Sequence, residues 1–210
     1  MERDRPARVE RRLSAILAAD VADYSRLMHS DEEPTHTRLA AVLAEVVNPS
    51  IAEHDGHVVK NTGDGLLAEF PSAVQAVRPA VQFQTRIKEL TTGEAEDRRI
   101  AFRVGINISD VIVESNDIFG DGVNIAARLE SIAEPGGICI SSSAYEHVRG
   151  KVGVEFAELG EQNLKNIARP IWAYAVAWDW LGDKERQHDT QPTFAATLVH
   201  GGVAVREYRR

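Results

Sequence analysis

Residues 57–70 read HVVKNTGDGLLAEF, and two apolar runs of strand length flank a short polar stretch. Asp-Gly between such runs is a strong signal for a β-hairpin, so this stretch predicts two neighbouring antiparallel strands. Lys60 and Asp64 flank the tightest part of the turn. Taken alone, Asp64 is explained better by the turn than by a binding site.

The sequence before the hairpin predicts one strand and one long helix. An apolar run at 13–19 predicts a strand that ends at Asp20. A capping box at 30–33, followed by apolar residues at helical spacing, predicts a long helix that stops near Gly56 and bends at Pro49.

The sequence after the hairpin predicts a second helix, capped by Ser72, and Pro79 inside it predicts a kink or a break. Its inward face is expected to carry Ala76, Ala80, Phe83, Ile87 and Leu90. Residues 99–107 alternate like a strand, 111–113 look like its hairpin partner, and the turn formers at 107–110 would join them. The remaining elements expected are a helix over about 121–131, a strand over 137–141, a short helix, and strands around 154–164 and 171–178.

Tight turns, rather than helical crossovers, join several of these strands. The sequence therefore predicts an α+β fold, in which helices pack on a mostly antiparallel sheet with a ferredoxin-like core. We expect a tail over residues 1–11, one domain over 12–178 and a C-terminal extension over 179–210.

Composition excludes several functional classes. The 210 residues carry a net charge of -8 without a basic stripe, so nucleic acid is not an expected partner. No apolar stretch is long enough to span a membrane, and a cytoplasmic protein is expected. The single cysteine, Cys139, lies in an apolar run and is expected to be a buried core residue.

Two aspartates stand at the ends of strand-like runs, where a site would form. Asp20 follows the first strand and Asp64 lies in the hairpin, so their carboxylates converge if the strands are neighbours. Like charges this close repel unless a cation separates them, and Mg²⁺ prefers such oxygen ligands. A helix cap and a turn are the alternatives for the two residues. P-loop, GxGxxG and HExxH motifs are absent from the sequence.

Two further pairs have polar groups that suit a nucleotide. Asn124 and Arg128 share one face of a predicted helix, where an arginine can reach a phosphate. Lys60 and Asp117 offer a donor and an acceptor for the edge of a base. Ordinary surface charges are the alternative for each of these residues.

These residues lie in five stretches that resemble, in order, the signatures of class III adenylate/guanylate cyclase catalytic domains. The stretches cover residues 12 to about 178 and read AILAADVADYSRL, VVKNTGDGLLAEF, FRVGINISDVIVE, NDIFGDGVNIAARLESIAEPGGICIS and LGEQNLKNIARPIWAYAV. Five such stretches in register are a highly specific resemblance, and it implies the nucleotide cyclase fold.

The resemblance implies a metal site and a phosphate loop. Asp20 and Asp64 match the metal-binding aspartates, and the backbone carbonyl of Val21 matches the third protein ligand. Two Mg²⁺ or Mn²⁺ ions are implied in each active site. Tyr24 and Ser25 match the loop that wraps the triphosphate.

The same resemblance implies how the nucleotide is held. Lys60 and Asp117 match the pair that recognises adenine, and Asn124 and Arg128 match the residues that orient the ribose and stabilise the transition state. Lys165 matches a lysine that contacts the terminal phosphates.

The function implied is an adenylate cyclase that converts ATP to 3′,5′-cyclic AMP and pyrophosphate. In the family, the aspartates come from one subunit and the base-reading and transition-state residues from the other, so a head-to-tail homodimer with shared sites is expected. A guanylate cyclase and a catalytically silent cyclase-like module are the alternatives. Two departures affect the expected activity and dimer: Ala22 and Asp23 stand where many relatives have a glycine beside the aromatic residue, and the segment between Val113 and Asp117 is short.

Overall fold

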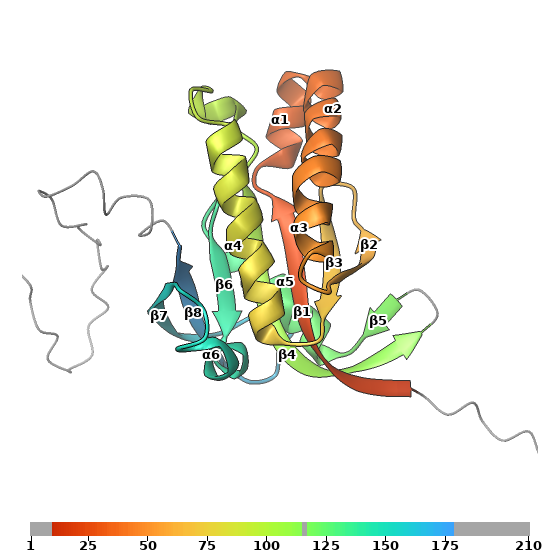
Figure 1. The fold of residues 1–210 in the computed structure, drawn as a ribbon, viewed down its shortest axis with the longest axis vertical. Coiled ribbons are helices and arrows are strands. Elements are labelled where there is room, and N and C mark those ends of the chain that lie inside the picture. Colours follow the sequence, from red (N-terminus) through yellow and green to blue (C-terminus); the bar gives the residue numbers. More distant parts are fainter. Residues whose placement is uncertain (1–9, 115–116, 179–210) are drawn as a thin grey trace, which may run out of the picture.

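A computed structural model describes residues 10–114 and 117–178 of the chain. Its described part folds into one eight-stranded sheet with helices packed on it (Figure 1). The strands are β1 (Glu10–Val21), β2 (His57–Asn61), β3 (Gly65–Phe70), β4 (Phe102–Glu114), β5 (Asp117–Phe119), β6 (Ile138–Ser141), β7 (Glu155–Gln162) and β8 (Ile171–Ala177). The helices are α1 (Tyr24–Ser30), α2 (Glu32–Val42), the π-helical η1 (Leu43–Val47), α3 (Asn48–Ala52), α4 (Ala73–Leu90), the 3₁₀-helical η2 (Glu96–Arg98), α5 (Asp121–Ile132) and α6 (Ser142–Val148).

The sheet has the order β2-β3-β1-β4-β6-β8-β7, and β5 pairs with β4. Every described strand pair is antiparallel except β4 with β6. The predicted α+β fold with a mostly antiparallel sheet is therefore confirmed. The residues expected to form the tail up to residue 9 and the extension 179–210 lie outside the described residues, and β1 begins at Glu10.

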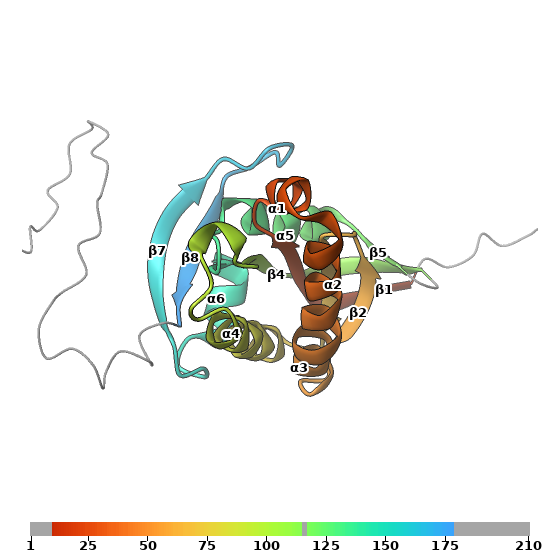
Figure 2. The same ribbon diagram turned by 90° about the horizontal axis from the view of Figure 1, so that it is seen from above.

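Side chains of β1 alternate between the two faces of the sheet, and each face has its own core. Ala15, Leu17, Ala19 and Val21 belong to the larger core, which includes residues of α2, α3, α4 and α6. Ile16 and Ala18 belong to the smaller core under α5. Figure 2 shows α3 and α4 on one side of β1 and β4, with α5 on the other. Because successive side chains of a strand point to opposite faces, Asp20 follows Ile16 and Ala18 onto the α5 face.

The expected turn at 107–110 is wrong, because β4 runs without a break from Phe102 to Glu114. The strand pairs with β1 from Val21↔Phe102 to Glu10↔Val113, and this long ladder outweighs the local turn preference. Asn107 is buried in mid-strand, where its side-chain amide donates to the carbonyl of Gly122 and its oxygen accepts from Ser141. The hairpin partner of the end of β4 is instead β5.

The expected long helix before the hairpin is present as α2, η1 and α3, which follow one another without a gap from Glu32 to Ala52, and the short helix α1 precedes it. Ser30 does not cap a helix; its hydroxyl donates to the carbonyl of Arg26, and Asp31 occupies the cap position of α2 without a side-chain bond. The irregularity expected at Pro49 takes the form of the π-helical turn η1 just before it. Proline has no N–H with which to donate to the carbonyl four residues earlier, which accounts for an irregular turn at this place.

Helix α4 confirms the cap by Ser72, whose hydroxyl accepts from the N–H of Gln75. Of the kink or break expected at Pro79, the break is wrong, since the helix continues to Leu90. Four residues of its expected inward face, Ala76, Ala80, Phe83 and Ile87, are buried. Leu90 is 58% exposed, so its inward placement is wrong. Cys139 is buried as expected. No helix in the described ranges is long and apolar enough to cross a membrane.

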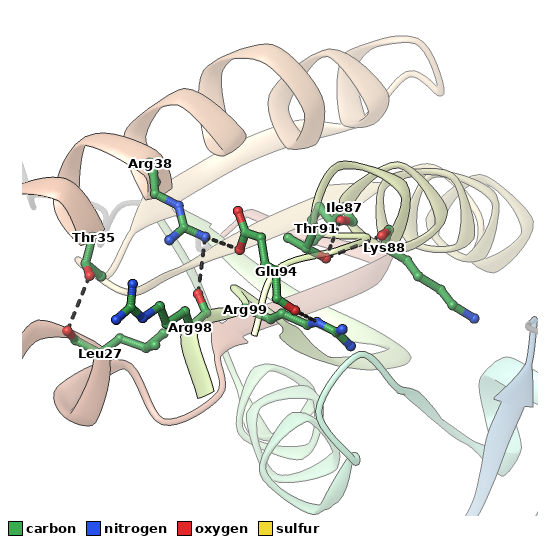
Figure 3. Close-up of polar contacts among 9 residues, drawn as sticks. All are labelled: Leu27, Thr35, Arg38, Ile87, Lys88, Thr91, Glu94, Arg98 and Arg99. Carbon is green, nitrogen blue, oxygen red and sulfur yellow. Dashed lines mark hydrogen bonds and ion pairs between the residues drawn. The ribbon is translucent and has the colours of Figure 1, made fainter. Parts of the chain in front are cut away.

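Polar contacts hold α2 against the segment after α4 and against α1 (Figure 3). Arg38 pairs with Glu94 at 2.6 Å and also donates to the carbonyl of Arg98. The hydroxyl of Thr35 donates to the carbonyl of Leu27, which ties α2 to α1. Because α1 begins directly after the exit of β1, these contacts fix the chain that leaves Asp20.

Gly105 of β4 permits the close approach of α5 to the sheet. A Cβ at this position would overlap the carbonyl oxygen of Ala126 and the backbone nitrogen of Glu130. Backbone atoms cannot move aside as a flexible side chain can, so Gly105→Ala is expected to lower the free energy of unfolding by about 1–3 kcal/mol. Urea unfolding followed by circular dichroism measures this loss.

Gly153→Ala is the matched control for this change. A Cβ at Gly153 meets no atom within 4 Å, so this variant is expected to unfold at or slightly above the wild-type midpoint. Equal midpoints for the two variants would show that α5 does not rest on Gly105 as described.

Candidate active site

Asp20 and Asp64 lie together because β1 and β3 are neighbours. Asp20 is paired with Gly65 in the ladder, and the N–H of Val21 donates to the carbonyl of Asp64 at 3.0 Å. A Cβ on Gly65 would overlap the backbone at Ala19 and Asp20, so this glycine lets the hairpin tip close onto β1. Burial and, after it, the negative charge of Asp64 raise the pKa of Asp20.

Asp20 has the environment of a cation ligand. Burial is the largest cause that raises its pKa, followed by Asp64, while the guanidinium of Arg103 acts in the opposite direction. One carboxylate oxygen, Oδ1, is buried and has no hydrogen-bond partner among the described residues. Asp20 and Asp64 are both half-buried, and an oxygen of Asp20 has no partner in the described ranges. A hard divalent cation fits this pair, because it would reduce the repulsion between the carboxylates and would bind the unpartnered oxygen.

Arg103 and Glu130 are part of this cluster, and sequence reasoning missed both. Arg103 is the β4 residue opposite Asp20, and its Nη2 lies 3.5 Å from Asp20 Oδ2. Its Nε lies 3.6 Å from Glu130 Oε1, on α5. Burial, Asp20 and Asp64 raise the pKa of Glu130 to about 7. Pairing of β1 with β4 would have placed Arg103 opposite Asp20. The turn expected at 107–110 divided β4, so this pairing was not predicted.

Arg128 and Lys165 form a second cluster at the outer side of α5. Arg128 is half-buried, and its Nε donates to the backbone carbonyl of Lys165 at 3.2 Å. Asn124 is exposed one turn earlier on the same helix. The contact joins the Arg128 side chain on α5 to the backbone of the connection between β7 and β8, and the Lys165 side chain is exposed.

Lys60 and Asp117 form a third cluster, in which both carboxylate oxygens are engaged. Lys60 Nζ donates to Asp117 Oδ1 at 2.9 Å and to Oδ2 at 2.7 Å. This hydrogen bond is the largest cause that lowers the pKa of Asp117. The N–H of Ile118 also donates to Asp117, and Lys60 lies 5.9 Å from the ring centre of Phe119. The pair places a fixed donor and a fixed acceptor side by side.

Tyr24 and Ser25 form the first turn of α1. Asp23, just before them, occupies the cap position with φ of 55°, in the left-handed region that favours glycine. Tyr24 is half-buried against the main core, whereas Ser25 is exposed. The hydroxyl of Ser25 is thus presented to solvent near the exit of β1.

The structure therefore gathers the expected residues into separate clusters. Asp20, Val21 and Asp64 lie together, as do Lys60 with Asp117 and Arg128 with Lys165. No hydrogen bond or ion pair within the described ranges joins one cluster to another. A hollow of about 400 Å³ near the end of α4 is lined by none of these residues.

The chain belongs to the family of adenylate and guanylate cyclase catalytic domains, whose pattern matches residues 11–177. A crystal structure titled adenylate/guanylate cyclase/hydrolase from Silicibacter pomeroyi is 45% identical, covers 80% of this chain and 98% of that chain, and has a TM-score of 0.74. The adenylyl cyclase CyaB from P. aeruginosa is 24% identical over 81% of this chain and 96% of that chain, with a TM-score of 0.73, and shares the fold.

Curated relatives are longer than this chain. A Rhizobium meliloti protein named "Putative adenylate cyclase 3" is 46% identical over 188 residues, which are 90% of this chain and 31% of the relative. A Streptomyces coelicolor adenylate cyclase is 30% identical over 141 residues, which are 67% of this chain and 35% of that protein. The chain thus spans about a third of the length of these relatives.

Proposed function

We propose that this domain is an adenylate cyclase that forms 3′,5′-cyclic AMP and pyrophosphate from ATP. The observation that carries the proposal is the pair Asp20 and Asp64, which presents a buried, unpartnered carboxylate oxygen at the end of the central strand. The family relationship and the name of the Rhizobium meliloti relative support the same activity.

In the proposed reaction the ribose 3′-oxygen forms a bond to the α-phosphorus, and the bond from that phosphorus to the oxygen of pyrophosphate breaks. Asp20, Asp64 and the Val21 carbonyl would hold two divalent cations, Mg²⁺ or Mn²⁺, which when bound supply Lewis-acid stabilisation of the 3′-oxyanion and of the leaving pyrophosphate. The proton of the 3′-hydroxyl leaves to solvent, and no side chain is assigned as its acceptor.

The remaining site residues bind and orient the substrate. Arg128 neutralises the charge that grows on the reacting phosphoryl group, and Asn124 orients the ribose. Tyr24 and Ser25 line the triphosphate at the start of α1, and Lys165 binds the terminal phosphates. Each role is proposed from the family pattern and from the exposed or half-buried position of the side chain.

Adenine is proposed as the base because of the pair Lys60 and Asp117. Adenine offers a ring nitrogen that accepts and an exocyclic amine that donates, which complement a lysine and a carboxylate. Guanine offers an oxygen and a ring N–H at the same edge, which would oppose both groups. Guanylate cyclase activity is the second candidate, since the family includes both activities.

The active site is proposed to form between two copies of the chain, arranged head to tail. One copy would supply the aspartates, and its partner would supply the pairs Lys60 with Asp117 and Asn124 with Arg128. The separation of these groups into clusters within one chain supports this arrangement, as does the exposure of the apolar side chains Phe119 (42%) and Ile132 (38%), on β5 and at the end of α5.

The direct test is an assay of the purified chain with Mn²⁺ and equal concentrations of ATP and GTP. Chromatography with mass detection is expected to find cyclic AMP as the main product. Cyclic GMP as the main product would support the second candidate. Absence of both products from a folded, dimeric protein would contradict the proposed activity. The remaining alternative would then be a catalytically silent cyclase-like module.

Asp117→Asn is expected to reduce kcat/KM for ATP by about tenfold or more, because it removes a charge-assisted hydrogen bond to the amine of adenine. The preference for ATP over GTP is expected to fall by a similar factor, and initial rates with each nucleotide measure it. Glu114→Gln is the control, since Glu114 is an exposed carboxylate opposite Asp117 in the β4–β5 hairpin. Equal losses in both variants would contradict base recognition by Asp117.

A further inference from the structure

Arg103 lies between two carboxylates and is fully engaged by neither. Its Nη2 is 3.5 Å from Asp20 Oδ2 and its Nε is 3.6 Å from Glu130 Oε1, distances of ion pairs rather than of hydrogen bonds. Both the Arg103 Nε and the Glu130 Oε1 atoms are buried without a hydrogen-bond partner among the described residues, as is Asp20 Oδ1. The two long ion-pair distances and the unpartnered Arg103 Nε and Glu130 Oε1 indicate a shared guanidinium rather than a closed salt bridge.

The fold holds Glu130 in this position. Gly105, two residues after Arg103 on β4, lets the backbone of α5 approach the sheet at Glu130 itself. The Glu130 side chain is 13% exposed and therefore has little freedom to turn toward water. Burial of a carboxylate is costly unless a partner compensates it. Arg103 makes the larger compensating contribution at Glu130, and Arg128 adds a smaller one.

We propose that Glu130 is a positioning residue, which draws the guanidinium of Arg103 away from Asp20 and so keeps Asp20 available to a divalent cation. Without Glu130, Arg103 would close onto Asp20 as a full salt bridge, and a bound cation would have to displace it. This inference rests on the proposed metal site at Asp20 and Asp64.

Glu130 acts here through Arg103 and not as a metal ligand. Among the described residues, no group of three or more His, Cys, Asp or Glu side chains lies close enough to hold a metal ion. Simple electrostatics offers a different explanation, because a lost negative charge weakens cation binding at any nearby site. The two explanations differ in one respect: only the proposed one requires Arg103.

The experiment is a double-mutant cycle on the affinity for Mn²⁺ alone, measured by electron paramagnetic resonance on the nucleotide-free chain. The proteins are the wild type, Glu130→Gln, Arg103→Gln and the double variant. In the wild type the Glu130 carboxyl, with a pKa of about 7, is mostly ionised at about pH 8. Because Arg103 lowers that pKa, the affinity of the Arg103→Gln protein is followed as the pH is raised, and the cycle is evaluated where that affinity no longer changes with pH. Glu130→Gln is expected to weaken Mn²⁺ binding by about tenfold. In the Arg103→Gln background the same change is expected to have an effect of less than about twofold.

Two controls accompany the cycle. Glu134→Gln removes an exposed carboxylate just beyond α5 and is expected to leave Mn²⁺ binding unchanged. In the cyclase assay, Glu130→Gln is expected to raise the Mn²⁺ concentration for half-maximal rate, while excess Mn²⁺ restores kcat; a misfolded variant would not recover.

Each outcome decides between the explanations. Unchanged Mn²⁺ affinity in Glu130→Gln, or an equal loss in both backgrounds, overturns the positioning role. Asp64→Asn identifies the site: if that variant binds Mn²⁺ as the wild type does, the proposed metal site fails first, and the inference falls with it. If Asp64→Asn loses binding while the cycle shows no coupling, the metal site stands and only the role of Glu130 is refuted.

Discussion

Asp64→Ala is expected to lower the rate of cyclic AMP formation at saturating ATP and Mn²⁺ by at least about 10³-fold. The change removes one of two carboxylates that lie together at the end of β1, while the turn itself depends on the neighbouring Gly63 and Gly65. The loss should fall on kcat, since the carboxylate acts on the reacting groups. Initial rates and the thermal midpoint of each protein measure the effect and the integrity of the fold.

Asp97→Ala provides the comparison for this loss. Asp97 is an exposed carboxylate whose backbone carbonyl, rather than its side chain, receives the bond from Arg26. This variant is expected to keep the wild-type rate. Product formation by Asp64→Ala at a near-wild-type rate would refute the metal assignment, whatever the result for Asp97.

Mixing Asp64→Ala with Arg128→Ala is expected to restore activity that neither protein has alone. In a head-to-tail dimer, a mixed pair has one site with an intact aspartate from one chain and an intact arginine from the other. With random exchange half of the dimers are mixed and each has one working site, so the mixture should reach about a quarter of the wild-type rate. Titration of one variant against the other, followed by the cyclase assay, measures this recovery.

The matched control mixes Asp64→Ala with Asp20→Ala. Both changes are expected to damage the aspartate side of a site, so every site in a mixed dimer has one lesion and no activity should return. Recovery in this control, or no recovery in the first mixture despite subunit exchange seen by native mass spectrometry, would contradict sites shared between subunits.

Local sequence patterns were sufficient to predict most of the helices and strands. The hairpin of β2 and β3, the cap of α4 by Ser72 and the position of α5 each depend on neighbours in sequence, and the structure confirms them. The turn expected at 107–110 failed because Asn107 satisfies its polar groups through residues distant in sequence, Gly122 and Ser141. A turn former in mid-strand is tolerated when tertiary contacts satisfy its polar groups.

The sequence also predicted part of the candidate site, namely the two aspartates, but not the residues that surround them. The position of Asp20 at the exit of the first strand and of Asp64 inside the next hairpin indicated a converging pair, and the structure brings them together. Arg103 and Glu130 could not be found in this way, because their importance depends on the register of β1 with β4 and on the seating of α5 over Gly105. Such long-range pairing is not encoded in any single stretch.

The hairpin of β2 and β3 also limits how this domain can change during evolution. Lys60 and Asp64 are four residues apart on it, and the ladder is already irregular between Val58 and Lys60. Insertion of one residue between them would turn the following side chains to the opposite face, and in the proposed dimer it would damage base recognition at one site and metal binding at the other. Changes of nucleotide preference are therefore expected to arise by substitution, with the length of this hairpin left unaltered.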